Sequence, residues 1–247
     1  MEAKMGKCYN LTSFMNIYRT MQYSEYRKSL SGIFSDTYFK RTEQYSLNFG
    51  YTVKCCIYEG NVGGLNLSAT HNELFDSRGE KIYGWQNIDD DGDFIELFCH
   101  SNGNHYLIFR IDLYGYSVFE IESRKELHYI PSQSYPKNNT EKKEETFIWT
   151  GAEYNPFNNI LLVNGCYWAV PYSVLLLDFS NPMTLKPAEN WLDIRNIIDP
   201  EFERYDDIEY KGWDTNGDLL LRGNYNDRWE SQKIKAKKVK TLLSKLE

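Results

Sequence analysis

The sequence lacks the motifs that mark common catalytic and cofactor sites. Its 247 residues contain no G-x-S-x-G nucleophile motif, no P-loop and no G-x-G-x-x-G dinucleotide motif. The histidines are too scattered for the ligand spacing of a zinc site, since they lie at His71, His100, His105 and His128. We therefore expect no cofactor, assign no catalytic residue and favour a protein that is not an enzyme.

Long apolar runs and a disulfide pattern are also missing. No run approaches the roughly 18 residues of a membrane-spanning helix, and residues 1–10 hold two lysines and a glutamate in place of an apolar signal-peptide segment. The five cysteines are odd in number and lack C-x-x-C spacing, which is typical of reduced intracellular thiols. These absences predict a cytoplasmic protein without a membrane span.

Basic residues are scarce outside the C-terminus. The net charge is −7, although residues 233–247 hold six lysines against one glutamate, so the rest of the chain is more acidic still. An acidic surface repels phosphate backbones, which excludes nucleic acid as the main partner and favours a basic surface on a protein partner. The most acidic stretch, 199–210, is either a solvated segment or a negative face that docks such a partner.

Short aromatic and β-branched segments, separated by glycine, asparagine and aspartate, follow Ser31 and predict a sheet-rich body. Residues 106–113 alternate at period two, and with 117–121 and 126–130 they predict a three-stranded meander. Residues 160–164 and 173–179 are apolar enough to be inner strands that are buried on both faces.

Two helices are expected at the ends of this body. Helical spacing predicts the first over 13–30, and Val239, Leu242, Leu243 and Leu246 with intervening lysines predict a short basic amphipathic helix. We expect a single domain over 1–247, in which a helical segment (1–30) and a C-terminal helix (237–247) flank a β-repeat body (44–236).

A phrase of a tryptophan, an Asn/Asp/Gly turn and an apolar strand occurs three times, at 84–95, 149–162 and 212–220. Such a phrase suits a hairpin unit whose tryptophan packs on the neighbouring unit. Over 44–236 the chain resembles a β-propeller, which implies repeated antiparallel sheets that share one core. A twisted β-sandwich is the alternative.

An acidic turn at 87–92 matches the first half of a calcium loop, with Asn87, Asp89 and Asp91 as its candidate ligands. The twelfth position is Phe98 instead of the glutamate that such a loop requires. We therefore favour a hairpin turn that uses Asp and Gly for backbone geometry, and expect no metal.

The least ordinary stretch, 164–172, joins the two apolar strands and holds Tyr167, Trp168 and Tyr172. A connection this apolar either plugs the core or forms the floor of a pocket. For a pocket, aromatic rings would stack on a ligand while carboxylates fix its polar groups. The ligand-binding candidates are Trp149, Glu153, Tyr167, Trp168, Tyr172, Asp178 and Trp213.

Two functions fit these features. The first is a non-enzymatic protein-interaction module with an acidic, aromatic-rich surface. The alternative is a carbohydrate-binding or carbohydrate-active protein that stacks sugars on tryptophans and uses two carboxylates, drawn from Asp89, Asp93, Glu153 and Asp178. A small molecule or glycan is therefore an open alternative to a protein ligand.

Overall fold

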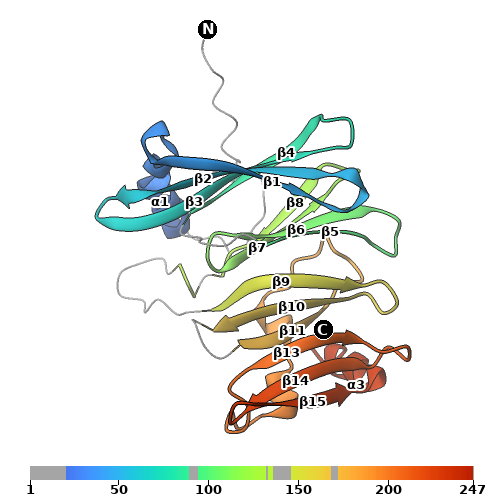
Figure 1. The fold of residues 1–247 in the computed structure, drawn as a ribbon. Coiled ribbons are helices and arrows are strands. Elements are labelled where there is room, and N and C mark those ends of the chain that lie inside the picture. The colour runs from blue at the N-terminus through green and yellow to red at the C-terminus, as the bar shows by residue number, and fades with distance from the viewer. Residues whose placement is uncertain (1–20, 89–93, 132, 136–145, 168–171, 247) are drawn as a thin grey trace.

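The structure is a computed structural model, which describes residues 21–88, 94–131, 133–135, 146–167 and 172–246. Four antiparallel sheets, here named A to D, follow one another along the chain (Figure 1). Sheet A contains β1 (Phe39–Ser46), β2 (Thr52–Val62), β3 (Leu65–Phe75) and β4 (Lys81–Ile88). Sheet B contains β5 (Ile95–Cys99), β6 (His105–Ile111), β7 (Gly115–Glu120) and β8 (Lys125–Tyr129).

Sheets C and D form the second half of the array. Sheet C contains β9 (Phe147–Asn155), β10 (Ile160–Tyr167), β11 (Tyr172–Asp178) and the two-residue β12 (Leu192–Asp193). Sheet D contains only β13 (Ile208–Trp213), β14 (Leu219–Tyr225) and β15 (Arg228–Ile234). Every strand in the four sheets pairs with its neighbour in sequence, so each sheet is a meander.

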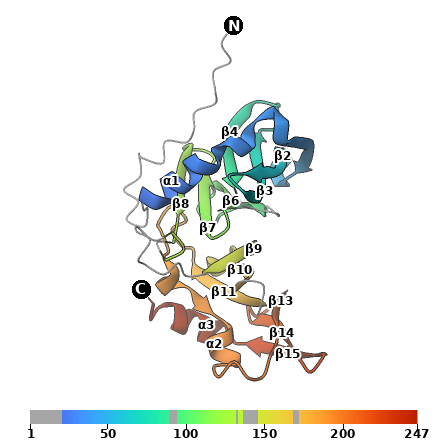
Figure 2. The ribbon, with the colours of Figure 1, turned by 90° about the vertical axis from the view of Figure 1, so that its left-hand side faces the viewer.

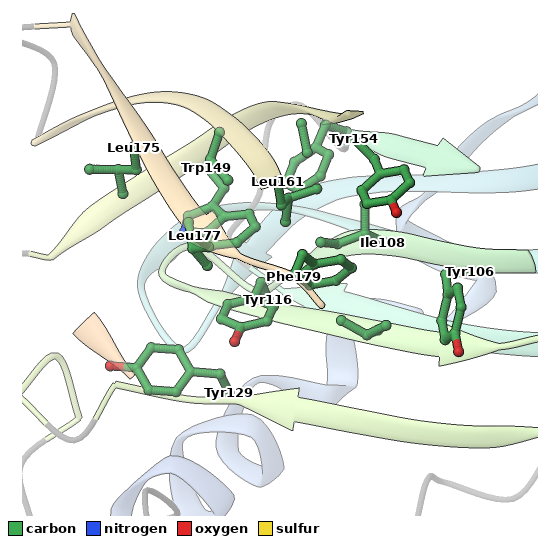
Figure 3. Close-up of a cluster of buried hydrophobic side chains, with 14 of the residues drawn as sticks. Tyr106, Ile108, Tyr116, Tyr129, Trp149, Tyr154, Leu161, Leu175, Leu177 and Phe179 are labelled. Atoms are coloured by element: carbon green, nitrogen blue, oxygen red, sulfur yellow. The ribbon is translucent and has the colours of Figure 1, made fainter. Parts of the chain in front are cut away.

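Neighbouring sheets stack face to face through apolar cores. Strand β6 contributes side chains to two of these cores: Leu107 and Phe109 face sheet A, while Tyr106 and Ile108 face sheet C. The core between B and C is rich in aromatic rings (Figure 3). A third core joins C and D through Leu162 and Leu176 of C and Ile208, Leu219 and Leu221 of D. None of the buried clusters among the described residues joins A to D, and the sheets follow a curved path (Figure 2).

One turn recurs in three hairpins, spanning 76–80, 100–104 and 214–218. In each, the first N–H donates to the fifth carbonyl, and the glycine at the fourth position donates to the first carbonyl. Those glycines (79, 103 and 217) have φ between 75° and 90°, a left-handed conformation that a side chain disfavours. Asp76 and Asp214 complete their turns by accepting two backbone N–H groups each.

Helices cover the ends and edges of the array. Helix α1 (Met21–Leu30) and the short helix η2 (Ser31–Phe34) cover sheet A, followed by η3 (Asp36–Tyr38). Within the sheets and their connections lie η4 (Asn48–Gly50), η5 (Ala188–Asn190) and α2 (Arg195–Ile198). Helix α3 (Ala236–Leu243) buries Val239 and Leu243 in the core between C and D. No helix in the described ranges is both long and apolar enough to cross a membrane.

An arginine connects each pair of neighbouring sheets. The partly buried Arg27 of α1 binds Asp112, in the β6–β7 turn of sheet B, and the carbonyl of Gln86 in sheet A. Arg110 of sheet B donates to the carbonyl of Trp149 in sheet C at 3.1 Å, and burial lowers the pKa of its guanidinium to about 10. Arg195 connects sheet C to the segment that leads into sheet D. Hydrogen bonds to charged groups therefore supplement the apolar contacts at every junction.

The prediction of a mainly β chain with repeated antiparallel sheets, an N-terminal helix and a short C-terminal helix is confirmed. The body begins earlier than predicted, at Phe39 instead of residue 44, and residues 13–20 of the predicted first helix lie outside the described residues. The predicted meander at 106–130 is present, with β5 as an additional first strand. Strand β6 is buried on both faces because sheets lie on both sides of it.

The tryptophan phrases hold two different positions. The second and third each place the tryptophan in the first strand of a sheet (β9 or β13) and the apolar segment in the second (β10 or β14). The first phrase instead runs from Trp85 in the last strand of sheet A to Ile95 in the first strand of sheet B. The sequence alone does not show whether two successive strands pair within one sheet or belong to two sheets that stack on each other.

Candidate functional site

Trp149 lies in the core instead of at a ligand-facing surface. Its side chain is fully buried between sheets B and C, with its ring stacked on Tyr116 at a centroid distance of 4.4 Å and an interplanar angle of 13° (Figure 3). Trp191 packs edge-on against it at 5.7 Å. The ring therefore offers no exposed face to a ligand and stabilises the stacking of the two sheets.

The other candidates of the 164–172 stretch lie at one end of sheet C. Tyr167 and Tyr172 close the β10–β11 hairpin and are both partly exposed, while Trp168 lies outside the described residues. The hydroxyl of Tyr167 donates to buried Asp193 at 3.1 Å, and burial together with that carboxylate raises the pKa of the Tyr167 phenol. Tyr172 donates its N–H to Asp207, within the acidic stretch 199–210.

Arg195 holds these two sequence regions together. Its guanidinium is buried and donates to the carbonyls of Tyr172, Tyr205 and Asp206. It also forms an ion pair with Asp199 at 3.3 Å. Because a guanidinium presents several donors in a fixed plane, one side chain positions both the hairpin and the acidic segment.

Asp199 fixes the conformation of the acidic segment. Its carboxylate accepts the N–H groups of Glu203, Arg204 and Tyr205 at 3.0–3.2 Å. Burial opposes ionisation of this carboxyl, but the three N–H groups and the charge of Arg195 outweigh it and lower its pKa. The segment is therefore a built loop, held by a buried ion pair and a set of charge-assisted hydrogen bonds.

Exposed aromatic rings project from this framework. Phe202 is 54% exposed and has a φ of 57°, a left-handed conformation that is uncommon for a bulky residue. Tyr225 and Trp229 flank the β14–β15 turn, each 41% exposed. Asp206 and Asp207 exchange backbone hydrogen bonds with Asn224, which places this turn next to the acidic segment. We call the exposed set Tyr167, Tyr172, Phe202, Tyr225 and Trp229 the aromatic rim.

Acidic side chains outnumber basic ones around the aromatic rim. Exposed carboxylates lie at Glu201, Glu203, Asp206 and Asp227. Two of the nearby arginines are engaged: Arg204 pairs with Glu230, whose pKa it lowers, and Arg222 stacks on the ring of Trp229 at 4.2 Å while it binds Glu209. Arg228, beside Tyr225, is exposed. The rim therefore combines fixed aromatic surface with excess negative charge.

A second group of candidates meets at the first strands of sheets C and D. The hydroxyl of Tyr210 in β13 donates to Glu153 in β9 at 2.6 Å, and the ring of Tyr210 packs edge-on against Trp213 at 6.4 Å. Burial and this carboxylate raise the pKa of Tyr210. Partial desolvation and the charge of Glu153 raise the pKa of Glu96 in β5. Asp178 lies apart from this group and binds Ser180 at the end of β11.

The structure places Asn87 in a strand, where it has structural partners. Its amide donates to the carbonyl of Arg110, and its oxygen accepts the N–H of Asp112, so it joins sheets A and B. Asp89 and Asp91, the other candidate calcium ligands, lie outside the described residues, as does Asp93. Among the side chains that the structure describes, no three His, Cys, Asp or Glu residues gather in a metal-binding group.

Comparison with known proteins identifies no family for this chain. No protein-family model matches it, and no curated protein does either. Among solved structures it is similar to "Crystal structure of HIRA(644-1017)", with a TM-score of 0.34 and 9% identity over 79% of this chain. The match covers 56% of that protein's chain, so this chain spans little more than half of its length. The function of this chain must therefore be inferred from its own structure.

Sequence reasoning missed four residues of the rim and its support: Arg195, Phe202, Tyr225 and Trp229. The acidic stretch was recognisable, but no periodicity shows that a buried arginine four residues before Asp199 pairs with it. Tyr225 and Trp229 lie beyond the third tryptophan phrase, 212–220, and match no motif. The one local signal was the Tyr-Asn-Asp-Arg turn, because Asn-Asp readily adopts positive φ at both central positions of a tight hairpin.

Proposed function

We propose that the protein is a non-enzymatic interaction module whose aromatic rim binds a basic segment of a partner protein. One observation carries this proposal: Phe202 is exposed on a loop that Arg195 and Asp199 hold in place, and Tyr225 and Trp229 are exposed beside the β14–β15 turn, which Asn224 joins to that loop. Rigid aromatic side chains supply large contact area at low entropic cost and are frequent anchors of protein interfaces.

Charge supports a basic partner. The exposed carboxylates Glu201, Glu203 and Asp206 lie on the loop that carries Phe202, Asp227 lies in the β14–β15 turn, and the chain as a whole carries −7. Complementary charge raises the association rate and selects against acidic partners more than it raises affinity. The left-handed φ of Phe202 fits the same role, since backbone strain that a fixed framework maintains is common at binding sites.

The test is a capture experiment with matched variants of the full chain. Immobilised wild type is expected to retain a basic protein from a lysate of the source organism, and retention should weaken as salt rises. The triple variant Phe202→Ala, Tyr225→Ala, Trp229→Ala should lose it. The control variant replaces three exposed aromatics of other surfaces (Phe39, Phe49 and Phe157) with alanine and should keep it. Equal retention by both triple variants would contradict the proposal.

A second candidate function is carbohydrate binding at the group of Glu153, Tyr210 and Trp213. It is favoured by the juxtaposition of two aromatic rings and a carboxylate from neighbouring first strands. Titration of the protein with a panel of mono- and oligosaccharides should change tryptophan fluorescence in wild type and not in Trp213→Phe. A flat response to every sugar removes this candidate.

Three further predictions accompany the proposal. We propose that residues 1–247 form a single domain, that the protein resides in the cytoplasm, and that nucleic acid is not its partner. The shared apolar cores between successive sheets support the first of these. The acidic charge supports the last.

A further inference from the structure

Sheet D contains one strand fewer than the other sheets. Sheets A, B and C have four strands each, whereas sheet D ends at its third strand, β15. After β15 the chain forms helix α3, which packs against the core between C and D. Strand β15 is thus an edge strand of sheet D (Figure 1), and within the described residues no strand pairs with its outer edge.

The register identifies the backbone groups at this edge. Asn224 exchanges backbone hydrogen bonds with Asp206 and Asp207 on the opposite side of β14, so Asn224 and Trp229 form a non-hydrogen-bonded pair. Pairs alternate along an antiparallel ladder, and therefore Trp229, Ser231 and Lys233 direct their N–H and C=O groups away from β14. These three residues present a row of donors and acceptors over the length of a short strand.

The surroundings of the edge define what an added strand would carry. Glu230 of β15 pairs with Arg204, so the acidic segment with Glu201 and Glu203 adjoins the strand. On the opposite face, Trp229 exposes part of its ring. A strand with a lysine or arginine toward the acidic segment, and an apolar side chain beside Trp229, would match both faces.

We propose that an extended, lysine- or arginine-containing segment of a partner protein adds to sheet D as its fourth strand, pairing with the outer edge of β15. This recognition mode rests on the proposed function and specifies how the partner is bound. Main-chain hydrogen bonds to Trp229, Ser231 and Lys233 would hold the segment, and side chains on its two faces would select it.

Hydrogen exchange of the full chain tests the edge first. The amides of Trp229, Ser231 and Lys233 should exchange faster than those of Glu230 and Gln232, which bond to β14. Slow exchange at the first three would overturn the proposal, because the edge would already be covered. If deletion of residues 1–20 then made these amides exchange rapidly, the chain's own N-terminal segment would be the occupant.

Binding is tested with twelve-residue peptides selected from a random displayed library on the wild-type protein. Ser231→Pro removes one outward N–H and leaves the β14–β15 hydrogen bonds intact, whereas Ser231→Ala keeps the N–H. Selected peptides should be rich in lysine and arginine, and should bind Ser231→Pro about tenfold more weakly and Ser231→Ala unchanged. Equal affinity for wild type and Ser231→Pro, or failure to select any edge-dependent peptide, would overturn strand addition.

Two controls separate this proposal from the proposed function and from misfolding. N-methylation of alternate peptide amides should abolish binding to wild-type protein in one register only, which requires no protein variant. Phe202→Ala changes the rim but not the edge of β15. Peptides that lose affinity for Phe202→Ala and keep it for Ser231→Pro would uphold the rim as a binding surface while contradicting strand addition.

Discussion

The two terminal sheets differ in how their outer faces are covered. Sheet A places Leu67, Ala69 and Ile88 on its outer face, and α1 and η2 cover them with Leu30 and Ile33. The outer face of sheet D carries Arg222, Asn224, Trp229, Ser231 and Lys233, and no helix among the described residues covers it. The apolar part of the outer face of sheet A is therefore covered, whereas the outer face of sheet D is open.

This difference indicates that a partner protein can contact the outer face of sheet D but not the covered part of sheet A. Apolar side chains on an end sheet need a cover within the chain, since an exposed apolar sheet promotes association. Sheet D needs no covering helix because its outer face is mostly polar and charged. The residues that remain exposed there, chiefly Trp229, are then available for recognition, and the four predictions below compare the two ends.

The largest expected effect concerns the arginines that connect the sheets at each end. Arg195→Met should lower the free energy of unfolding by about 3–5 kcal/mol, because it removes the counter-charge of Asp199 and the buried donor of three backbone carbonyls. Arg27→Met should cost less, about 1–3 kcal/mol, because Arg27 is partly exposed and Asp112 keeps Tyr23 and Ile88 as donors. Chemical denaturation of both variants measures this. A larger loss for Arg27→Met would reverse the ranking.

The cover of sheet A gives the next largest effect. Ile33→Ala should destabilise the protein by about 2–5 kcal/mol, because Ile33 is fully buried against the outer face of the sheet and its truncation leaves a cavity. The measurement is the denaturant midpoint, with the exposed Phe157→Ala as the control. A change below about 0.5 kcal/mol would mean that the helices do not stabilise this end.

The acidic segment at the open end predicts a pH dependence. The pKa of Asp199 is lowered in the folded state, so its stabilisation is complete above the unfolded pKa of about 3.9 and is lost as pH falls through the lower folded value. The stability difference between wild type and Asp199→Asn should thus be constant from about pH 5 to 7 and shrink below about pH 4. Asp227→Asn, at the exposed turn, is the control. A difference that does not vary with pH would contradict this assignment.

The smallest effect is expected on the uncovered face. Trp229→Ala should change the free energy of unfolding by less than about 1 kcal/mol, because the ring is 41% exposed and its main contact is the stacked guanidinium of Arg222. Thermal unfolding of Trp229→Ala and Ile33→Ala, measured side by side, compares the two losses of stability. A loss as large as that of Ile33→Ala would show that Trp229 stabilises the fold and is not held for recognition.

Local patterns in the sequence were sufficient for several of the strands and for the two end helices. The alternation at 106–113 and the apolar spacing of Val239, Leu242 and Leu243 report burial directly, so β6 and α3 were predictable. Sheet membership was not predictable, because Trp85 and Ile95 are close in sequence yet belong to different sheets. Strand β1 was also missed over residues 39–43, since its side chains are mostly exposed and carry no alternation.

The candidate site was predictable only in its parts. The aromatic hairpin and the acidic stretch each stood out by composition, but their juxtaposition depends on Arg195, whose partners lie at Tyr172, Asp199, Tyr205 and Asp206. Trp149 illustrates the same difficulty. A tryptophan near carboxylates suggested a ring that stacks on a ligand, whereas the ring is fully buried between sheets B and C. Contacts between distant segments decide both cases.

The strand order also has a consequence for synthesis on the ribosome. Because every ladder joins strands that are adjacent in the chain, each meander can complete its hydrogen bonds soon after it leaves the exit tunnel. Sheet A would form first and offer a template on which B, C and D assemble in turn. Of the four sheets, sheet D leaves the exit tunnel last, so it would fold against a sheet C that has already formed.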